Sequence, residues 1–252
     1  MDFVPTKLIE TGSMETASDD WFVDFNNDGK PQMSIGRLPV RSSADATLVV
    51  NKILAYEQSG APQAVVLVSD INDGIDFNAA NSQIKALIPS NLSVVNINRD
   101  QAQTDAKGVL MDQLNRGGRI VNYAGHGSVN LWRGGLLTDD DMSNLANHKT
   151  SPLVVTMTCL NGYFQDPKLA SLGESLLKVN NGGAVAVWAS TGMTDSDNQN
   201  VMNQEFFRQL FGNPSLTIGQ AIKAAKSATD DNDIRKTWTL LGDPTMRIKQ
   251  QP

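Results

Sequence analysis

Short apolar runs alternate with amphipathic stretches along the chain from residue 62 onward. The runs AVVLVSD at 64–70 and LSVVNIN at 92–98 are typical of buried strands, and NAANSQIKALI at 78–88 between them is typical of a helix. Three more apolar runs follow, RIVNYAG, LVVTMTC and AVAVWAST, and helical stretches separate or follow them. Near-continuous strands of valine, isoleucine and leucine that alternate with amphipathic helices indicate a parallel sheet covered on both faces. We therefore predict an α/β fold with a mainly parallel central sheet flanked by helices.

The beginning of the chain follows this pattern less closely. It contains the stretch DFNNDGKPQMSIGRLPV and then one helical stretch, ADATLVVNKILAYEQSG. This change predicts a small N-terminal lobe, or an edge of the same sheet, formed by residues 1–60 and packed on a larger domain of residues 61–252.

Composition and charge argue against several classes of partner. Hydrophobic residues make up 40% of the chain and charged residues 19%, which is ordinary for a globular protein. The net charge is −6 and no cluster of lysine and arginine stands out, so we expect no binding to nucleic acid or to an anionic membrane surface. No uncharged run approaches the roughly 18–20 residues of a membrane span. The first residues, MDFVPTKLIETG, lack the basic and apolar regions of a signal peptide.

The single cysteine and one of the two histidines lie where strands of the predicted sheet end. Functional groups of parallel α/β sheets gather beyond the carboxyl ends of the strands. The run RIVNYAG leads directly to His126, and the run PLVVTMT leads directly to Cys159. If the two strands are neighbours, their axes lie about 4.8 Å apart, and both side chains could face one substrate bond. The other histidine, His148, is expected in a surface loop.

Glycines surround both residues, with Gly125 and Gly127 flanking the histidine and Gly162 following the cysteine. Glycine lets another backbone approach closely and exposes amide N–H groups to an anion. A thiol nucleophile, an imidazole for proton transfer and N–H groups for an oxyanion are what acyl transfer requires. The pattern alone leaves a second interpretation open, in which Cys159 is a small buried residue and His126 occupies an ordinary turn.

The two segments resemble the catalytic signature of the gingipain family of cysteine peptidases. NYAGHGSVNLW is followed about thirty residues later by VVTMTCLNGYF, and other matching motifs occur at corresponding places: SIGRLPV (34–40), NKILAYE (51–57), LGESLL (172–177), GGAVAVWAST (182–191) and TWTLLGDPTMRI (237–248). The resemblance covers most of residues 20–249. It implies the caspase-like fold, a three-layer sandwich, with residues 61–252 as the catalytic domain.

The resemblance also implies the chemistry. Cys159 would be the nucleophile and His126 the general acid and base, and the two side chains need not be in contact at rest. The backbone N–H groups of Gly127 and Cys159 would form the oxyanion hole. The chemistry requires no cofactor, and the substrates would be proteins or peptides. The implied function is cysteine endopeptidase activity through a thioester intermediate.

The segment SDINDGIDFNAAN (69–81) follows a strand at the same edge of the sheet, so its carboxylates could reach the cleft. Asp76 falls where the arginine-specific gingipains carry their pocket aspartate, which implies cleavage after arginine and secondly after lysine. The residues alone also allow Asp76 to cap the helix that begins near Asn78. Asp70, at the strand end, resembles the acidic group that orients the histidine, although Asp73 lies nearby.

The pocket-lid tryptophan of the arginine-specific members has no counterpart in this chain, because Met193 and Thr194 occupy that region. We therefore expect a looser pocket to which these two residues contribute. Trp132 is a further candidate for contact with the substrate near the cleft, and burial in the core is the alternative.

A structural calcium site is a further hypothesis. The stretch DFNNDG places Asp24, Asn26 and Asp28 at alternating positions before a glycine, as in the first half of an EF-hand loop. The twelfth position is Ile35 instead of a bidentate glutamate, so the motif is incomplete. Either another acid completes a calcium site, or the stretch is a plain turn between two strands. Gingipains do bind calcium, although their ligands do not map onto this loop by motif.

Two functions other than peptide hydrolysis stay open. One is a non-catalytic caspase-like scaffold module of a larger secreted protein, and the other is a transpeptidase that uses the same dyad. By resemblance, we expect a secreted or cell-surface protein with a propeptide or further domains in a larger precursor.

Overall fold

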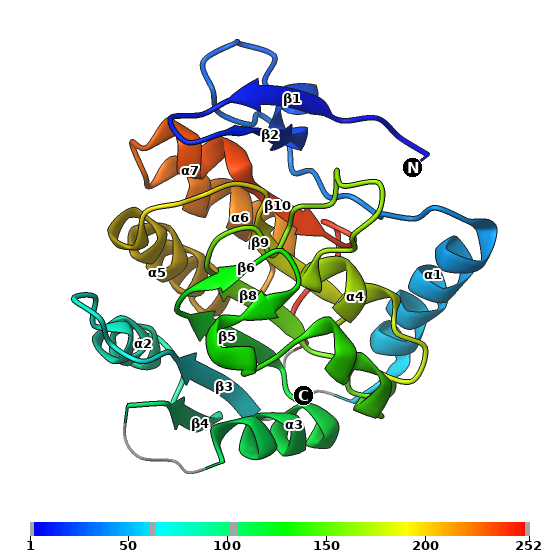
Figure 1. Cartoon of the computed structure of the whole chain (residues 1–252), viewed down its shortest axis with the longest axis vertical. Coiled ribbons are helices and arrows are strands. Elements are labelled where there is room, and N and C mark those ends of the chain that lie inside the picture. The colour runs from blue at the N-terminus through cyan, green and yellow to red at the C-terminus, as the bar shows by residue number, and fades with distance from the viewer. Residues whose placement is uncertain (1–2, 61–63, 101–104, 250–252) are drawn as a thin grey trace.

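A six-stranded sheet forms the centre of the protein, whose computed structural model describes residues 3–60, 64–100 and 105–249. The strand order is β10-β9-β8-β5-β3-β4, and all neighbouring pairs are parallel except β10 with β9. This arrangement confirms the predicted mainly parallel sheet (Figure 1). The strands are β3 (Ala64–Ser69), β4 (Ser93–Asn98), β5 (Ile120–Ala124), β8 (Leu153–Met157), β9 (Ala186–Ser190) and β10 (Trp238–Leu241).

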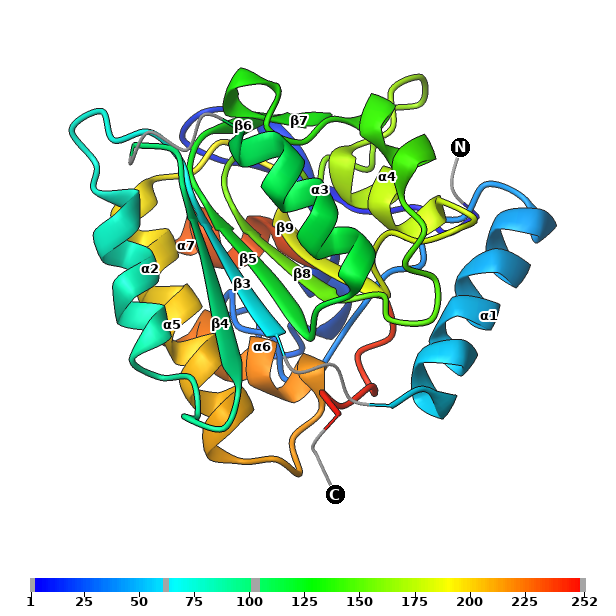
Figure 2. The same ribbon diagram turned by 90° about the horizontal axis from the view of Figure 1, so that it is seen from below.

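Helices cover both faces of the sheet, which makes the predicted three layers (Figure 2). One face carries α1 (Ser43–Gln58), α3 (Ala106–Arg116) and α4 (Leu172–Lys178). The other face carries α2 (Phe77–Lys85), α5 (Ser196–Gly212) and α6 (Ile218–Ser227). A short helix, α7 (Asn232–Thr237), leads into β10.

Alternate side chains of the strands pack into two apolar cores, one on each side of the sheet. On β3, Val65 and Leu67 belong to the core that contains α5 and α6, whereas Val66 and Val68 belong to the opposite core. Successive residues of a strand point to opposite faces, so a strand buried on both faces is apolar at most of its positions. Burial of such side chains is worth about 1.5–3 kcal/mol each and holds the layers together.

The described residues before 61 add a hairpin and a helix to this framework. β1 (Lys7–Glu10) pairs antiparallel with β2 (Glu15–Ser18) in a separate two-stranded sheet. Ala17 of β2 and Val49 of α1 are buried in the same core as strands of the main sheet. The predicted boundary at residue 60 adjoins residues 61–63, which lie outside the described residues, and the two-part division stays a prediction.

Two buried ion pairs hold the segment that follows β2, and one of them ties it to α6. They involve adjacent residues of the 3-10 helix Asp19–Val23, which follows β2. Asp19 pairs with Arg37 at 2.6 Å, and Asp20 pairs with Lys226 of α6 at 2.7 Å. Breaking one partner of a buried pair leaves an uncompensated charge, so these contacts fix where the hairpin docks.

The parallel strands all end at one edge of the sheet, and the segments that follow them meet there. A small hairpin, β6 (Gly127–Ser128) with β7 (Leu131–Trp132), follows β5 at this edge. The residues that come soon after the strand ends, in order across the sheet, are Arg99, Asp70, His126, Cys159 and Gly192.

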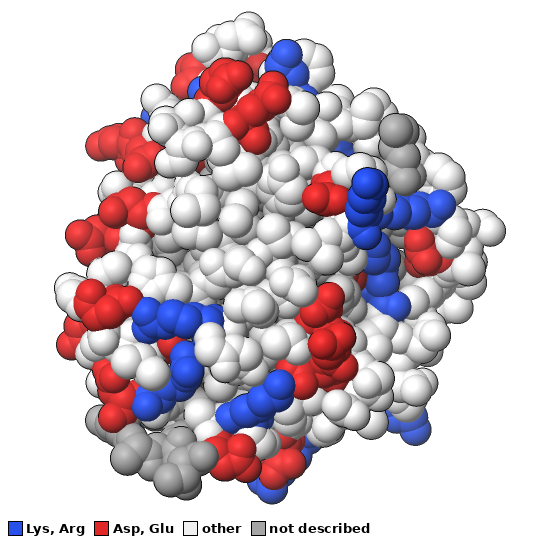
Figure 3. All heavy atoms as spheres, in the orientation of Figure 1, with Lys and Arg blue, Asp and Glu red and all other residues white. Residues whose placement is uncertain are grey.

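Acidic and basic side chains are interspersed on the face shown in Figure 3, and they form no continuous basic area there. The middle of this face is largely uncharged. Within the described part of the chain, no helix combines the length and the apolar character that crossing a bilayer requires.

Candidate active site

His126 and Cys159 follow two adjacent strands at the same offset. β5 pairs in parallel with β8, and Ala124 lies opposite Met157. His126 comes two residues after Ala124, and Cys159 comes two residues after Met157. The fold therefore brings both side chains to the same edge of the sheet, on neighbouring strands.

The chain turns sharply directly after Cys159. Leu160 has a φ of 62°, in the left-handed region that residues with a side chain rarely adopt. The N–H of Leu160 donates to the carbonyl of Gly192 at 3.2 Å, and the N–H of Gly162 donates to that of Ser190 at 2.7 Å. These bonds fix the turn to the end of β9. Strained backbone that is held in this way by its surroundings is a frequent feature of functional turns.

The thiol of Cys159 is partly exposed and lies 3.7 Å from both the carbonyl oxygen and the hydroxyl oxygen of Thr194. That hydroxyl accepts a hydrogen bond from the side chain of Gln199 at 2.6 Å. Met193, the preceding residue, is exposed. Of the two residues predicted to shape the pocket, Thr194 therefore contacts the thiol, and Met193 lies at the surface.

The imidazole of His126 is 42% exposed, and its Nε2 lies 3.1 Å from Oδ2 of Asp73. The ring of Phe77 meets the imidazole edge-on at a centroid distance of 5.4 Å. Among the described residues, no hydrogen bond joins the imidazole to the thiol of Cys159. Such a separation at rest is what the resemblance implies for this pair.

Asp70 holds the backbone of His126 and not its ring. The N–H of His126 donates to Oδ2 of Asp70 at 3.1 Å. The Asp70 carboxylate is fully buried and also pairs with two arginine side chains, at 2.5 and 2.6 Å. A Cβ at Gly125 would come within 2.4 Å of the Asp70 Cβ, so Asp70 packs against this glycine and reaches the next N–H along the chain. The ring contact predicted for Asp70 is made by Asp73.

Gly127 lets the β6–β7 hairpin approach the strand that carries the cysteine. A Cβ at this position would lie 2.8 Å from Oγ1 of Thr158 and 2.9 Å from the carbonyl oxygen of Leu131. Real Cβ atoms do not come so close to other heavy atoms, so any larger residue would displace the hairpin. The glycine is therefore required for the observed approach of the histidine segment to β8.

Trp132 is a core residue, so its assignment to the substrate-binding residues was wrong. Its side chain has no exposed surface. The indole stacks on Tyr123 with a centroid distance of 4.1 Å and an interplanar angle of 6°, and its Nε1 donates to Oδ1 of Asn161 at 2.8 Å. The β6–β7 hairpin folds back on the sheet, and this reversal directs the indole inward.

Asn161 links the cysteine turn to the histidine hairpin, a role that the sequence did not reveal. The side chain is fully buried, and its Oδ1 accepts from Trp132 and also from Thr156, at 2.7 Å. Its Nδ2 donates to the carbonyl of Ser128 at 2.6 Å. The available signal was a polar residue followed by glycine directly after a strand, in CLNG.

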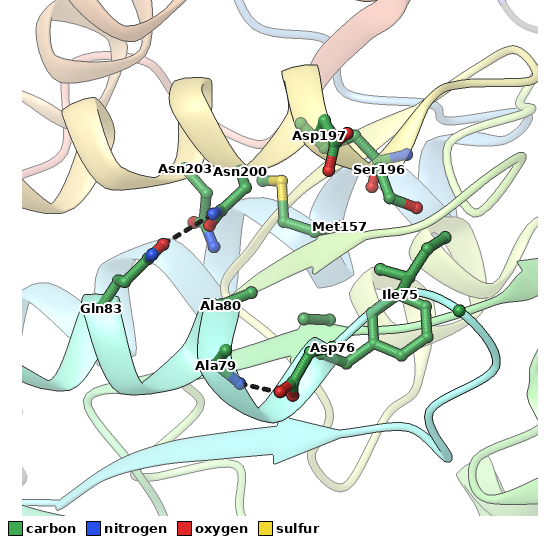
Figure 4. A pocket seen from close by; sticks show the side chains of 14 residues that line it. Ile75, Asp76, Ala79, Ala80, Gln83, Met157, Ser196, Asp197, Asn200 and Asn203 are labelled. Atoms are coloured by element: carbon green, nitrogen blue, oxygen red, sulfur yellow. Dashed lines mark hydrogen bonds between the residues drawn. The ribbon is translucent and has the colours of Figure 1, made fainter.

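A cavity of about 300 Å³ opens between α2 and α5, next to the two strands. Ala124 at the end of β5 and Met157 at the end of β8 line it. Figure 4 shows Asp76 at the start of α2 and Asp197 near the start of α5 on opposite sides of this cavity. The sequence analysis did not single out Asp197, whose position depends on how α5 packs beside α2.

Asp76 caps α2 and also lines the cavity. Its Oδ1 accepts the N–H of Ala79 at 2.8 Å and the side-chain amide of Asn72 at 3.1 Å. The helix-capping interpretation is therefore confirmed, and it coexists with a place in the cavity wall. Contact of Asp76 with a substrate stays a prediction.

The sequence model of Peptidase family C25 matches residues 1–249. The chain belongs to this family. Gingipain R2 of Porphyromonas gingivalis is 23% identical over 250 residues, which cover 88% of this chain and 33% of that protein. Lys-gingipain W83 of the same organism is 26% identical over 186 residues, which cover 69% of this chain and 10% of that protein. The C25 chain therefore spans at most about a third of the length of these relatives.

The fold of the C25 chain is also that of a solved relative. The crystal structure of the Arg-specific cysteine proteinase gingipain R aligns with a TM-score of 0.80 and 21% sequence identity. The alignment covers 98% of this chain and 62% of that chain. This similarity confirms the predicted caspase-like fold.

The loop for which calcium was predicted forms a turn in this C25 chain. Both carboxylate oxygens of Asp24 accept backbone N–H groups, from Asp28 at 3.0 Å and Gly29 at 2.8 Å, and Oδ1 of Asp28 accepts the N–H of Lys30 at 3.0 Å. Gly29 has a φ of 75°, which suits a turn. Asn26 adds no acid, and no group of three or more His, Cys, Asp or Glu side chains in the described residues could hold a metal. This donor set fits calcium poorly.

Proposed function

We propose that this C25 chain is a cysteine endopeptidase that uses Cys159 as nucleophile and His126 as general acid and base. The observation that supports this most directly is the placement of the two side chains at the ends of adjacent parallel strands, with the partly exposed thiol on a strained turn. A scaffold that only retained the fold would have no need of a strained backbone beside a free thiol.

In the proposed reaction, the Cys159 sulfur attacks the carbonyl carbon of the scissile peptide bond and forms a tetrahedral intermediate. The backbone N–H groups of Gly127 and Cys159 stabilise its oxyanion. His126 transfers the thiol proton to the departing amine, and the C–N bond breaks to leave a thioester. Water then attacks the thioester carbon while His126 accepts a proton from it. The C–S bond breaks and releases the carboxylic acid product, and His126 returns the proton to the Cys159 sulfur. No step requires a cofactor.

We propose that the cavity between α2 and α5 binds a basic side chain of the substrate, arginine first and lysine second. The carboxylates of Asp76 and Asp197 line it from two sides. The amide oxygens of Asn200 and Asn203, in the same wall, are buried without a hydrogen-bond partner among the described residues. A guanidinium carries five N–H donors in a planar fork and matches such acceptors better than an ammonium does. The relatives include proteins named for arginine and for lysine specificity.

Substrate profiling tests both proposals. The intact protein should cleave a peptide library after basic residues, and Cys159→Ala should abolish turnover and labelling by a thiol-directed probe. Asp76→Ala should lower kcat/KM for arginine substrates by on the order of 10²-fold. The matched control is Asp105→Ala, because Asp105 caps α3 through the N–H of Gly108 at 2.8 Å but does not line the cavity.

The possible outcomes distinguish the peptidase from the two alternative functions. An unchanged preference in Asp76→Ala would remove this residue from the specificity pocket, and turnover that survives in Cys159→Ala would end the proposed mechanism. A wild-type protein without turnover or labelling would favour the scaffold alternative. Amide products that form when an amine is added would favour the transpeptidase. A secreted or cell-surface location and a propeptide or further domains in a precursor remain predictions from the resemblance.

A further inference from the structure

Arg133, directly after β7, contacts both His126 and the loop that follows β3. Its backbone N–H donates to the carbonyl of His126 at 2.8 Å. Its Nε lies 2.6 Å from Oδ2 of Asp70, and its Nη1 pairs with Oδ2 of Asp73. Its Nη2 donates to the carbonyl of Ile71. One guanidinium therefore connects the two aspartates and the loop between them.

The two aspartates hold different parts of the same histidine. Asp70 accepts the backbone N–H of His126 at 3.1 Å, and Asp73 meets Nε2 of the ring at 3.1 Å. The side chain of Asp70 has no exposed surface, whereas that of Asp73 is 38% exposed. Arg99 adds a second anchor, since its Nη1 meets Oδ1 of Asp70 at 2.5 Å and donates to the carbonyl of Arg133 at 2.8 Å. The network thus has a buried end at Asp70 and an exposed end at the imidazole.

We propose that Arg133 is a positioning residue that fixes the imidazole of His126 by clamping the exposed Asp73 to the buried Asp70. The catalytic consequence of this clamp rests on the proposed function. An isolated ion pair at the surface contributes only about 0–1 kcal/mol, so Asp73 and His126 alone would not hold one geometry. The planar guanidinium restricts Asp73 because its nitrogens bind several acceptors in fixed directions.

The clamp also determines which ring nitrogen carries the proton. The hydrogen bond from Arg133 lowers the pKa of Asp73 below its usual range, which keeps the carboxylate ionised. An ionised carboxylate can only accept hydrogen bonds, so the imidazole nitrogen that faces it carries a proton. The neutral ring is then protonated at Nε2, and Nδ1 is left to exchange the proton of the reaction.

Nitrogen-15 NMR of the histidine rings tests this proposal without any need for turnover. The chain contains only two histidines, so His148 is an internal reference for His126. We expect the neutral His126 ring of the wild type in the Nε2–H form. Arg133→Met and Asp73→Asn should both shift it toward a mixture of the two tautomers. Arg116→Met removes an equal charge from the exposed end of α3 and should leave the ring unchanged.

Steady-state kinetics provide the second measurement. Arg133→Met should lower kcat by about 10–100-fold with little change in KM, and Arg133→Lys should restore only part of the loss because lysine lacks the fork. An unchanged tautomer in Arg133→Met, or an effect on KM alone, would overturn the proposal. If the wild type shows no turnover, the proposed function fails, and the tautomer measurement still decides whether Arg133 positions the ring.

Discussion

Several buried side chains that are not expected to touch a substrate determine the geometry around His126 and Cys159. Tyr123 donates its hydroxyl to the carbonyl of His126 at 2.7 Å, and burial raises the pKa of this tyrosine, so the donor stays neutral. Asn161 performs the corresponding role for the cysteine turn. The backbone segments that carry the two proposed reacting groups are thus held by buried hydrogen bonds, and we expect small displacements of these supports to alter the proposed chemistry.

Replacement of Asn161 tests the link between the two segments. Asn161→Ala removes the acceptor of Trp132 Nε1 and of the Thr156 hydroxyl, and both donors stay buried without that partner. Each unpaired buried group costs about 1–3 kcal/mol, so thermal and chemical denaturation should show a clear loss of stability together with a fall in kcat/KM. The control is the exposed Asn91→Ala. Equal stability of Asn161→Ala and wild type would show that the side chain links nothing.

Replacement of Gly127 tests the approach of the hairpin to β8. A methyl group there would meet Thr158 and Leu131 at less than normal contact distance, so the hairpin and His126 must move. Misplacement of a reacting group by about 1 Å costs on the order of 10²-fold in rate, and we expect a loss of this order in kcat/KM for Gly127→Ala. Gly212→Ala is the control, because a Cβ there would meet nothing within 4 Å. Full activity of Gly127→Ala would contradict the requirement for glycine.

A buried lysine of helix α1 is hydrogen-bonded to the C-terminal end of helix α4. The Nζ of Lys52 donates to the carbonyls of Leu177 at 2.7 Å and Leu176 at 3.4 Å, in the last turn of α4. A cation at a helix C-terminus is favourable for the helix dipole. Burial nevertheless lowers the pKa of Lys52 to about 8, so the fold carries a desolvation cost while this side chain is charged.

This cost gives a prediction about stability and pH. Below pH 8, Lys52 is protonated in the folded and unfolded states alike, and the cost is fully present. Between about pH 8 and 10 the unfolded chain binds more protons at this site, so the free energy of unfolding should rise with pH by about 1–2 kcal/mol. Burial raises the pKa of Tyr56 to about 12, which acts in the opposite direction above pH 10. Denaturation at several pH values should show the rise in wild type relative to Lys52→Met, and parallel curves would refute it.

The hydrogen bonds within the loop 24–29 give a prediction about calcium. Because both Asp24 oxygens accept backbone N–H groups, we expect added calcium or a chelator to leave the melting temperature unchanged. Asp24→Ala should still destabilise the protein by about 1 kcal/mol through the lost hydrogen bonds. A melting temperature that rises with calcium in the wild type but not in Asp24→Ala would instead establish a structural calcium site.

For the whole molecule, the sequence was informative about the sheet and much less so about the contacts at its edge. Strands such as 65–68 are apolar because both faces are buried, and this pattern is local enough to read from the residues. The strand-end rule then placed His126 and Cys159 at one edge. The contact between Asp73 and the imidazole depends on the path of the loop after β3. The burial of Trp132 depends on the path of the β6–β7 hairpin after β5. Those paths are set by packing between distant segments, which periodicity does not encode.

We propose that the carboxyl-terminal edge of the central sheet combines a nucleophilic cysteine, its histidine and a pocket for a basic side chain. Intact-mass spectrometry with peptidyl acyloxymethyl ketones tests all three parts in one measurement. A probe with arginine next to the reactive group should add one label at Cys159. Labelling should be absent in Cys159→Ala, strongly slowed in His126→Ala, and absent with a probe that carries glutamate in place of arginine. Equal labelling by the arginine and glutamate probes, or no label on the wild-type protein, would contradict the account.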